Sequence, residues 1–285
     1  MLTLTVAATA AAGAYAMLGV SIVVLYRMAG VVNFSVAVVG AFGAYTTAVA
    51  FGRGWPFGAA MVAGIVLAAA LATLTGLIFA RFFATADSAA RTAAMIAATV
   101  GFFAVGFRIF GDAPRSVPVL FPGVSWSAGN VVVTLSSIIV IGAAILTVLV
   151  MRWVLARTRL GSQVRAMSER PVTAELLGVP IYARTATVWG FTGAVSAFGM
   201  IVVASNLPGG FSSLGFLIFP AMAAALIGAF RSLPLAFAGG LVVAVIESLS
   251  SYRPSWAEYR GAVPFLIALV VLLWTQRKQV WDAAR

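Results

Sequence analysis

Long apolar stretches alternate with short polar interruptions along the chain. Each stretch runs for roughly fourteen to twenty-three residues, and a helix rising about 1.5 Å per residue needs about twenty to cross the hydrocarbon of a bilayer. The nine stretches lie at residues 4–26, 31–51, 58–80, 92–110, 131–151, 185–205, 211–230, 234–251 and 262–275. None shows the alternation of a transmembrane β-strand. The pattern predicts an all-α, polytopic helical membrane protein with about nine membrane segments, forming a single domain over residues 1–285.

Two of these stretches contain polar or helix-breaking positions. Asn33, Phe34 and Ser35 stand at the start of the second stretch, and Asn206 opens the irregular sequence 206–215 before the seventh. Broken helices are tolerated at membrane depth only where protein or a water-filled cavity surrounds them. Both positions are therefore candidates for a transport pathway, with an ordinary boundary loop as the alternative.

Glu247 is the only acidic residue inside an apolar stretch. A carboxylate in the membrane costs about 2.5–3.5 kcal/mol on insertion scales, so it normally faces the bundle interior or a cavity. One interpretation makes Glu247, together with Ser248, a pathway or gating group. The other is a structural ion pair or hydrogen bond near the outer end of its helix, with Arg108 or Arg253 as the partner.

The longest polar interruption, residues 152–184, predicts how the chain is oriented. It contains six arginines, and loops rich in Arg and Lys face the cytoplasm. Alternating outward from this loop through nine spans places thirteen basic residues inside and five outside. We therefore expect the N-terminus outside and the C-terminus inside, in a multi-pass protein of the bacterial plasma membrane.

Composition removes several classes of function. Of 285 residues, 62% are hydrophobic and 9% charged, too few charged groups to cover a soluble domain. The net charge of +11 comes from basic residues scattered between apolar stretches, which does not indicate nucleic-acid binding. The sequence has no cysteine and no histidine, so we expect no metal site and no catalytic residues.

Within the cytoplasmic loop, the sequence favours a short helix near residues 170–178. Pro171 suits a first helical position, Ala174 and Leu177 give the helix an apolar side, and Gly178 can end it. A short amphipathic helix of this kind is suited to docking a soluble partner, and a plain connecting loop is the alternative.

The same loop resembles that of the Liv-type branched-chain amino acid permeases of ABC importers. The resemblance rests on an ordered set of motifs: Arg157-Thr158-Arg159-Leu160-Gly161, Ser168-Glu169, Ala174-Glu175-Leu176-Leu177-Gly178-Val179, Val32-Asn33-Phe34, Gly43-Ala44-Tyr45, Leu120-Phe121-Pro122-Gly123 and Ile246-Glu247-Ser248-Leu249. Together these favour a divergent H-type subunit.

The resemblance implies a mechanism divided between chains. Such a permease pairs with a second permease, two cytoplasmic ABC ATPases that bind the ATP, and an extracytoplasmic solute-binding protein. It implies that the coupling loop contacts an ATPase, and the residues expected there are Arg165, Glu169, Arg170, Ala174, Leu177 and Gly178. This chain has no phosphate-binding loop motif, so it needs no cofactor of its own.

Three departures from the family pattern concern the solute. No acidic residue follows Asn33-Phe34, Pro220 or a neighbour replaces a frequent lysine, and Gly228-Ala229-Phe230-Arg231-Ser232 replaces a glycine-rich turn. The first two departures remove charged groups that could face a polar, zwitterionic solute. The solute is therefore a branched-chain amino acid or a more apolar compound or organic acid, or else the partner permease lines most of the pathway. A secondary active transporter is the alternative function, against which stands the single intramembrane acid. A membrane enzyme is a third, and the chain lacks catalytic groups for it.

Overall fold

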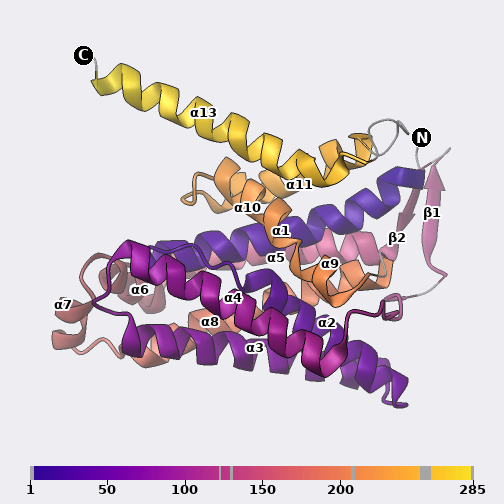
Figure 1. The fold of residues 1–285 in the computed structure, drawn as a ribbon, viewed down its shortest axis with the longest axis horizontal. Helices are drawn as coiled ribbons and strands as arrows, with labels where there is room; N and C mark the ends of the chain where they lie inside the picture. Colours follow the sequence, from indigo (N-terminus) through magenta and orange to yellow (C-terminus); the bar gives the residue numbers. More distant parts are fainter. Residues whose placement is uncertain (1–2, 122, 129–130, 207–208, 251–257, 284–285) are drawn as a thin grey trace.

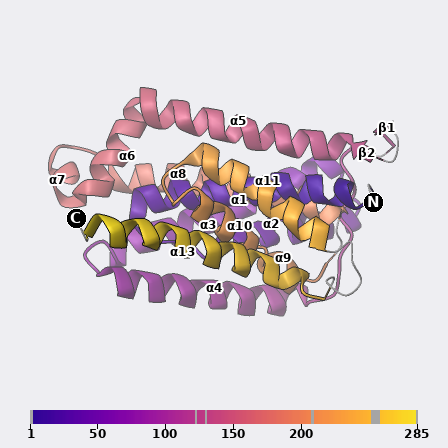
Figure 2. The same ribbon diagram turned by 90° about the horizontal axis from the view of Figure 1, so that it is seen from above.

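Helix α1 (Thr3–Ala29) runs through the middle of the molecule, and other helices enclose it (Figures 1 and 2). The computed structural model describes residues 3–121, 123–128, 131–206, 209–250 and 258–283. The remaining helices and strands are α2 (Val36–Gly52), α3 (Phe57–Phe82), α4 (Ser88–Phe110), β1 (Ser125–Ala128), β2 (Val131–Thr134), α5 (Leu135–Arg157), α6 (Arg159–Glu169), α7 (Pro171–Leu176), α8 (Ile181–Asn206), α9 (Phe211–Gly215), α10 (Ile218–Ile227), α11 (Leu233–Ser250), the 3-10 helix η1 (Arg260–Ala262) and α13 (Val263–Ala283).

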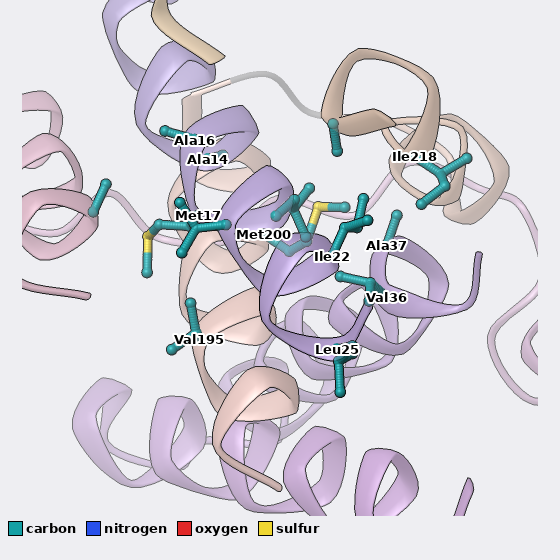
Figure 3. Packing of buried hydrophobic residues seen from close by; sticks show 14 of the residues in the cluster. Ala14, Ala16, Met17, Ile22, Leu25, Val36, Ala37, Val195, Met200 and Ile218 are labelled. Carbon is teal, nitrogen blue, oxygen red and sulfur yellow. The ribbon is translucent and has the colours of Figure 1, made fainter. Parts of the chain in front are cut away.

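Small and apolar side chains allow the central helix to be enclosed on all sides. In the span Thr9–Ala29, 89% of the most apolar part is buried, and α1 packs most extensively against α11, α8 and α5. Ala14, Ala16 and Met17 form the core with neighbouring helices, and Leu25 continues it toward the start of α2 (Figure 3). A helix that is apolar all around, as α1 is, must be buried in protein or lipid.

The outer helices present apolar faces to the surroundings. In α4 only 11% of the most apolar part is buried, and α13 leaves Leu266, Val270 and Leu273 exposed. A soluble protein rarely exposes such large apolar areas, so these faces indicate contact with lipid or with another membrane chain. The chain is therefore a polytopic helical membrane protein.

Each of the nine expected stretches overlaps a helix, although the helices differ in length. In the described residues six helices are long and apolar enough to cross a membrane: Thr9–Ala29, α3, α4, α5, α8 and α11. Three shorter apolar helical segments, Val36–Gly52, Phe211–Ile227 and Arg260–Gln276, correspond to the second, seventh and ninth expected spans. The seventh is divided into α9 and α10, consistent with the helix break expected near its start.

A short hairpin interrupts the otherwise helical architecture. Strands β1 and β2 pair antiparallel, with Ser125 opposite Thr134, and α5 begins at Leu135 instead of at residue 131. Residues 131–134 are three valines and a threonine, and β-branched side chains favour the extended conformation. Thr134 then caps α5, since its hydroxyl oxygen accepts a hydrogen bond from the backbone N–H of Ser137 at 3.3 Å.

The two ends of the bundle carry different elements. The hairpin and the start of α1 lie at one end, whereas α6, α7 and the last turns of α13 lie at the other (Figures 1 and 2). We call these the hairpin end and the α7 end.

Candidate functional site

The chain between α5 and α8 projects from the α7 end as two short helices (Figure 1). Thr158 separates α5 from α6, because its hydroxyl group donates to the carbonyl of Val154 at 2.7 Å and accepts from the N–H of Gly161 at 3.3 Å. Gly161 lies directly against the backbone of Leu155, where a Cβ atom would collide. Val164 and Met167 bury the inner face of α6. The sequence did not predict this first helix.

Helix α7 has the form that the sequence predicts. Pro171 occupies its first turn, and Ala174, only 2% exposed, packs inward against the bundle. Gly178 ends the helix with φ +82°, a left-handed conformation that favours glycine, and its N–H donates to the carbonyl of Glu175 at 2.9 Å. The prediction of a short helix near residues 170–178 is therefore confirmed.

The outer face of α7 is apolar and exposed. Leu176 is 83% exposed and the adjacent Leu177 is 80% exposed, and Val172 lies on the same short helix at 62%. The polar Glu169 and Arg170 beside them are exposed as well. A six-residue helix flanked by charged residues is too short and too polar to enter lipid. Its protruding leucines are suited to fill a groove on a soluble partner.

Arg165 belongs to α6, the helix before α7. Its guanidinium group donates to the backbone carbonyl of Leu155 on α5 and lines a pocket with three other arginines. Of the six expected coupling residues, Glu169, Arg170, Leu177 and Gly178 are exposed on or beside α7. Ala174 is buried, and Arg165 contacts the backbone of Leu155 on α5.

A cavity of about 300 Å³ lies between the base of α7 and the ends of four helices of the bundle. Glu169 and Pro171 line one side of it, and the opposite walls come from the last turns of α1 and α3, the start of α4 and the start of α8. The residues that line these walls include Met28, Phe79, Arg91 and Trp189. Helix α7 itself packs against α6 and against α8.

Asn33 and Ser35 form a polar turn just before α2. The side-chain oxygen of Asn33 accepts hydrogen bonds from the N–H of Ser35 at 2.8 Å and from its hydroxyl group at 2.7 Å. Both residues are buried, and with Thr192 and Ser196 of α8 they line a space of only about 10 Å³. That is about the size needed for one water molecule. Phe34 is half-buried and packs against the main core.

Asn206 lies far from this polar turn. It ends α8 ten residues beyond Ser196, about 15 Å along the helix, and its amide donates to the carbonyl of Val202 at 2.8 Å. The structure therefore does not bring the two candidate breaks together. The turn at Asn33 and Ser35 lies beside the middle of α8, whereas Asn206 is the last residue of α8.

Near Asn206, long-range contacts hold α9 in place. Asp112 accepts hydrogen bonds from the N–H and the hydroxyl group of Ser212, both at 2.8 Å. The hydroxyl group of Tyr45 lies 2.9 Å from the carbonyl oxygen of Gly209 and 3.0 Å from that of Ala113. The sequence did not predict these hydrogen bonds around α9. The only signal available was an isolated acid directly after an apolar stretch.

Phe211 lies at the centre of an aromatic cluster beside these hydrogen bonds. Its side chain is fully buried, and the rings of Phe42, Tyr45 and Phe110 have centroids 5.2, 5.3 and 5.8 Å away. Rings at these distances stabilise one another beyond the area they bury. The cluster joins α9 to α2 and α4 and fills the hairpin end of the bundle.

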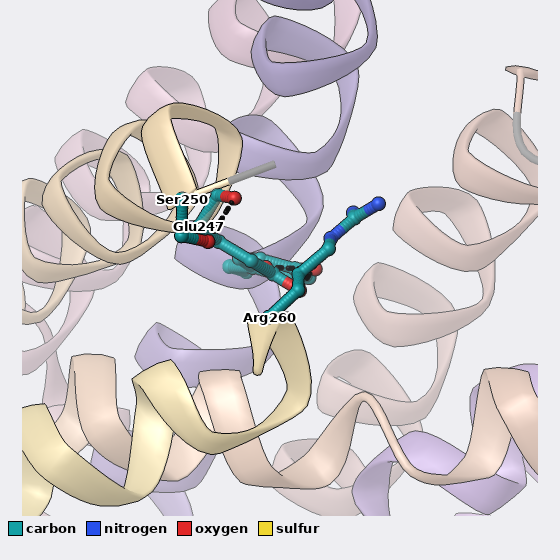
Figure 4. Close-up of polar contacts among 4 residues, drawn as sticks. Glu247, Ser250 and Arg260 are labelled. Carbon is teal, nitrogen blue, oxygen red and sulfur yellow. Dashed lines mark hydrogen bonds and ion pairs between the residues drawn. The ribbon is translucent and has the colours of Figure 1, made fainter. Parts of the chain in front are cut away.

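Glu247 links three elements at the hairpin end. Its carboxylate accepts a hydrogen bond from the hydroxyl group of Tyr15 on α1 at 2.8 Å and forms an ion pair with Arg260 of η1 at 3.1 Å (Figure 4). The observed cation is Arg260 instead of Arg108, and Arg253 lies outside the described residues. Ser248 is the next residue on α11 and is half-buried. This geometry favours the structural interpretation of Glu247.

Comparisons with known proteins agree in the fold and in the family. The sequence profile of a family described as the permease component of branched-chain amino acid transport systems matches residues 4–272. The high-affinity branched-chain amino acid transport system permease proteins LivH of Escherichia coli K12 and of Salmonella typhimurium LT2 are each 28% identical, over 91% of this chain and 88% of the relative.

One solved structure is similar along almost the whole chain. PsaBC from Streptococcus pneumoniae, solved in complex with Fab, superimposes with a TM-score of 0.53, covering 94% of this chain and 89% of that one. The two sequences are only 16% identical, so this likeness supports the fold alone.

Proposed function

The chain belongs to the family of permease components of branched-chain amino acid transport systems, and on this premise we propose that it forms one half of a solute pathway whose movement is driven through α7. It is a permease subunit of an ABC importer, a multi-pass membrane protein and a transport subunit rather than an enzyme. The observation that carries the proposal is the exposed apolar face of α7 above the cavity at its base.

We propose that four kinds of chain work together in this importer. A second permease completes the pathway, two cytoplasmic ABC ATPases bind and hydrolyse ATP, and an extracytoplasmic binding protein delivers the solute. Leu176 and Leu177 enter a groove of one ATPase, with Glu169, Arg170 and Gly178 at the rim of the contact and Ala174 fixing α7 from below. Closure of the ATPases moves α7, and the residues around the cavity beside Glu169 and Pro171 pass the movement to the ends of α1, α3, α4 and α8.

The same proposal includes nine membrane segments, with the α7 end in the cytoplasm of a bacterial cell. The last turns of α1, α3 and α5 carry Arg27, Arg81 and Arg157, all toward the α7 end. Basic residues at the ends of membrane helices favour the cytoplasmic side. An odd number of segments agrees with the opposite positions of the start of α1 and the end of α13 in Figure 2. The N-terminus is then outside and the C-terminus inside.

We propose that the breaks at Asn33-Phe34-Ser35 and at Asn206 border the pathway, one deep and one near the hairpin end. Both contain polar groups at the ends of apolar helices, and the closed space beside Asn33 and Ser35 corresponds to a state that admits at most one water. The solute is a branched-chain amino acid, as the family description suggests, or a more apolar compound or organic acid, because no acidic residue follows Asn33-Phe34.

The experiment that tests this function is uptake by vesicles containing the complete importer. With the binding protein outside and ATP inside, we expect radiolabelled leucine or another small solute to accumulate. No accumulation is expected with a non-hydrolysable ATP analogue. Accumulation driven by a proton or sodium gradient without ATP would instead identify a secondary transporter.

Replacing Glu247 by glutamine is expected to lower stability without stopping uptake. The amide keeps a hydrogen bond with Tyr15 but loses the charge that pairs with Arg260, whose side chain is 43% exposed, so the cost is about 1 kcal/mol. Thermal unfolding of the purified importer measures this loss, with the exposed Glu258→Gln as the control. Normal stability combined with lost uptake would place Glu247 in the pathway after all.

A further inference from the structure

Four arginines from four separate parts of the chain converge on one pocket near the α7 end. Arg27 comes from the last turn of α1, Arg152 from α5, Arg165 from α6 and Arg231 from the turn between α10 and α11. The pocket has a volume of about 460 Å³, and its other lining residues are Leu155, Ala156, Ser232, Leu233 and Pro234. None of these lining residues is acidic.

All four arginines are exposed at the pocket, so an anion that enters it meets several positive charges at once. The one recorded ion pair among the described side chains joins Glu247 and Arg260, and no carboxylate lines this pocket. Like charges beside the low-dielectric membrane repel one another more strongly than in water. Guanidinium groups also present a planar fork of donors that matches the oxygens of a phosphate.

The backbone that carries Arg231 is held in an unusual conformation. Ala229 and Phe230 have φ of 49° and 53°, values that non-glycine residues rarely adopt. The N–H groups of Arg231 and Ser232 both donate to the carbonyl of Gly228 at 2.9 Å. The ring of Phe230 packs against that of Tyr26 at 4.9 Å, next to Arg27. Strained backbone of this kind persists where the surrounding structure fixes it, often at a binding site.

An exposed apolar stripe leads away from the pocket along α5. Ile145 and Leu149 are 44% and 59% exposed, and they share a helix face with Arg152 and Ala156 at spacings of four, three and four residues. The pocket therefore presents positive charge at the end of a membrane helix and an apolar surface beneath it. A ligand that matches both has an anionic head and a hydrocarbon tail.

We propose that this pocket binds the phosphate of an anionic phospholipid, whose acyl chain lies along Ile145 and Leu149. Arg27, Arg152, Arg165 and Arg231 contact the phosphate oxygens, and Ser232 borders the site. Basic pockets between membrane helices near the cytoplasmic surface are suited to such headgroups. The bound lipid joins α1, α5, α6 and the α10–α11 turn. It thus stabilises the base from which α6 and α7 project, whichever solute the importer carries.

The test measures lipid affinity of the full-length chain in nanodiscs of phosphatidylcholine. Phosphatidylglycerol is titrated in, and retained lipid is counted by native mass spectrometry. The combined variant Arg27→Gln, Arg152→Gln and Arg231→Gln is expected to bind phosphatidylglycerol about 100-fold more weakly. Its matched control is Arg53→Gln with Arg108→Gln, which removes exposed arginines on α4 and after α2 and is expected to leave the affinity unchanged.

Several outcomes would overturn the proposal. Equal phosphatidylglycerol affinity of the wild type and the combined variant excludes the site. Equal thermal stabilisation by inorganic phosphate, without anionic lipid, identifies a site for a free anion. Unchanged lipid binding with lost ATPase co-purification assigns the arginines to an acidic surface of the ATPase. If the combined variant does not fold, Arg231→Gly alone is used, and it must weaken phosphatidylglycerol binding at least about threefold.

Discussion

Replacing Leu177 by aspartate is expected to abolish ATP-driven uptake while the chain still reaches the membrane in normal amount. The side chain is 80% exposed at the tip of α7, so the folded permease loses no internal contact when it changes. Under the proposed function, the same side chain fills a groove of the ATPase in the complex. Losing a buried leucine costs about 1.5–3 kcal/mol, and burying an unpaired carboxylate adds to that cost. Binding of the ATPase then weakens about 100-fold or more.

Co-purification of the ATPases with the tagged permease measures this effect, together with uptake in vesicles. The control is Ser162→Asp, which adds the same charge on the exposed side of α6, where the hydroxyl group of Ser162 donates only to the carbonyl of Arg159 in its own helix. We expect the control to retain both activities. If Leu177→Asp keeps the ATPases bound and the solute transported, α7 is not the coupling contact.

The sequence predicted those features that depend on residues close to one another along the chain. Runs of apolar side chains located the membrane helices, because lipid imposes the same requirement at every position of a span. Local rules also located α7, since Pro171 at its start and Gly178 at its end act within one or two turns. Helix ends were less accurate: α2 begins at Val36, five residues later than expected, because Asn33 and Ser35 hold the preceding turn.

Helix α6 was missed because its apolar face is small. Only Gly161, Val164 and Met167 are buried among its eleven residues, Leu160 is partly buried, and most of the others are polar, so the segment reads as a loop. It forms because α5, α1 and α8 supply a packing surface for this face. Tertiary packing, rather than the periodicity of a short segment, decides such cases.

Contacts between distant parts of the chain could not be predicted at all. Tyr15 and Glu247 are 232 positions apart, and Asp112 and Ser212 are 100 apart, yet each pair forms a 2.8 Å hydrogen bond. No periodicity connects such positions. The arginines near the α7 end were understood only as topology signals, because their convergence depends on how α1, α5, α6 and α11 pack together.

Replacing Gly240 by valine is expected to separate the central helix from α11 and to destabilise the whole bundle. A Cβ atom at Gly240 would overlap the backbone nitrogen of Ala16 and lie 2.6 Å from its Cα atom and 2.9 Å from the carbonyl carbon of Tyr15. These neighbours are backbone atoms of α1, which cannot turn aside as a flexible side chain can. Small residues permit such close approach between membrane helices.

The expected loss of stability is about 3 kcal/mol or more, the upper end of the range for overpacking, because α1 is fixed by α5 and α8 as well. Thermal unfolding in detergent and the yield of folded protein measure it. Gly101→Val is the matched control, since no atom outside its own helix lies within 4 Å of a Cβ atom at that position on α4. Equal stability of the two variants would show that α1 and α11 lie farther apart in the membrane than the structure places them. The hydrogen bond between Tyr15 and Glu247, which joins the same two helices one residue before Ala16 and seven after Gly240, would then be too long to form as well.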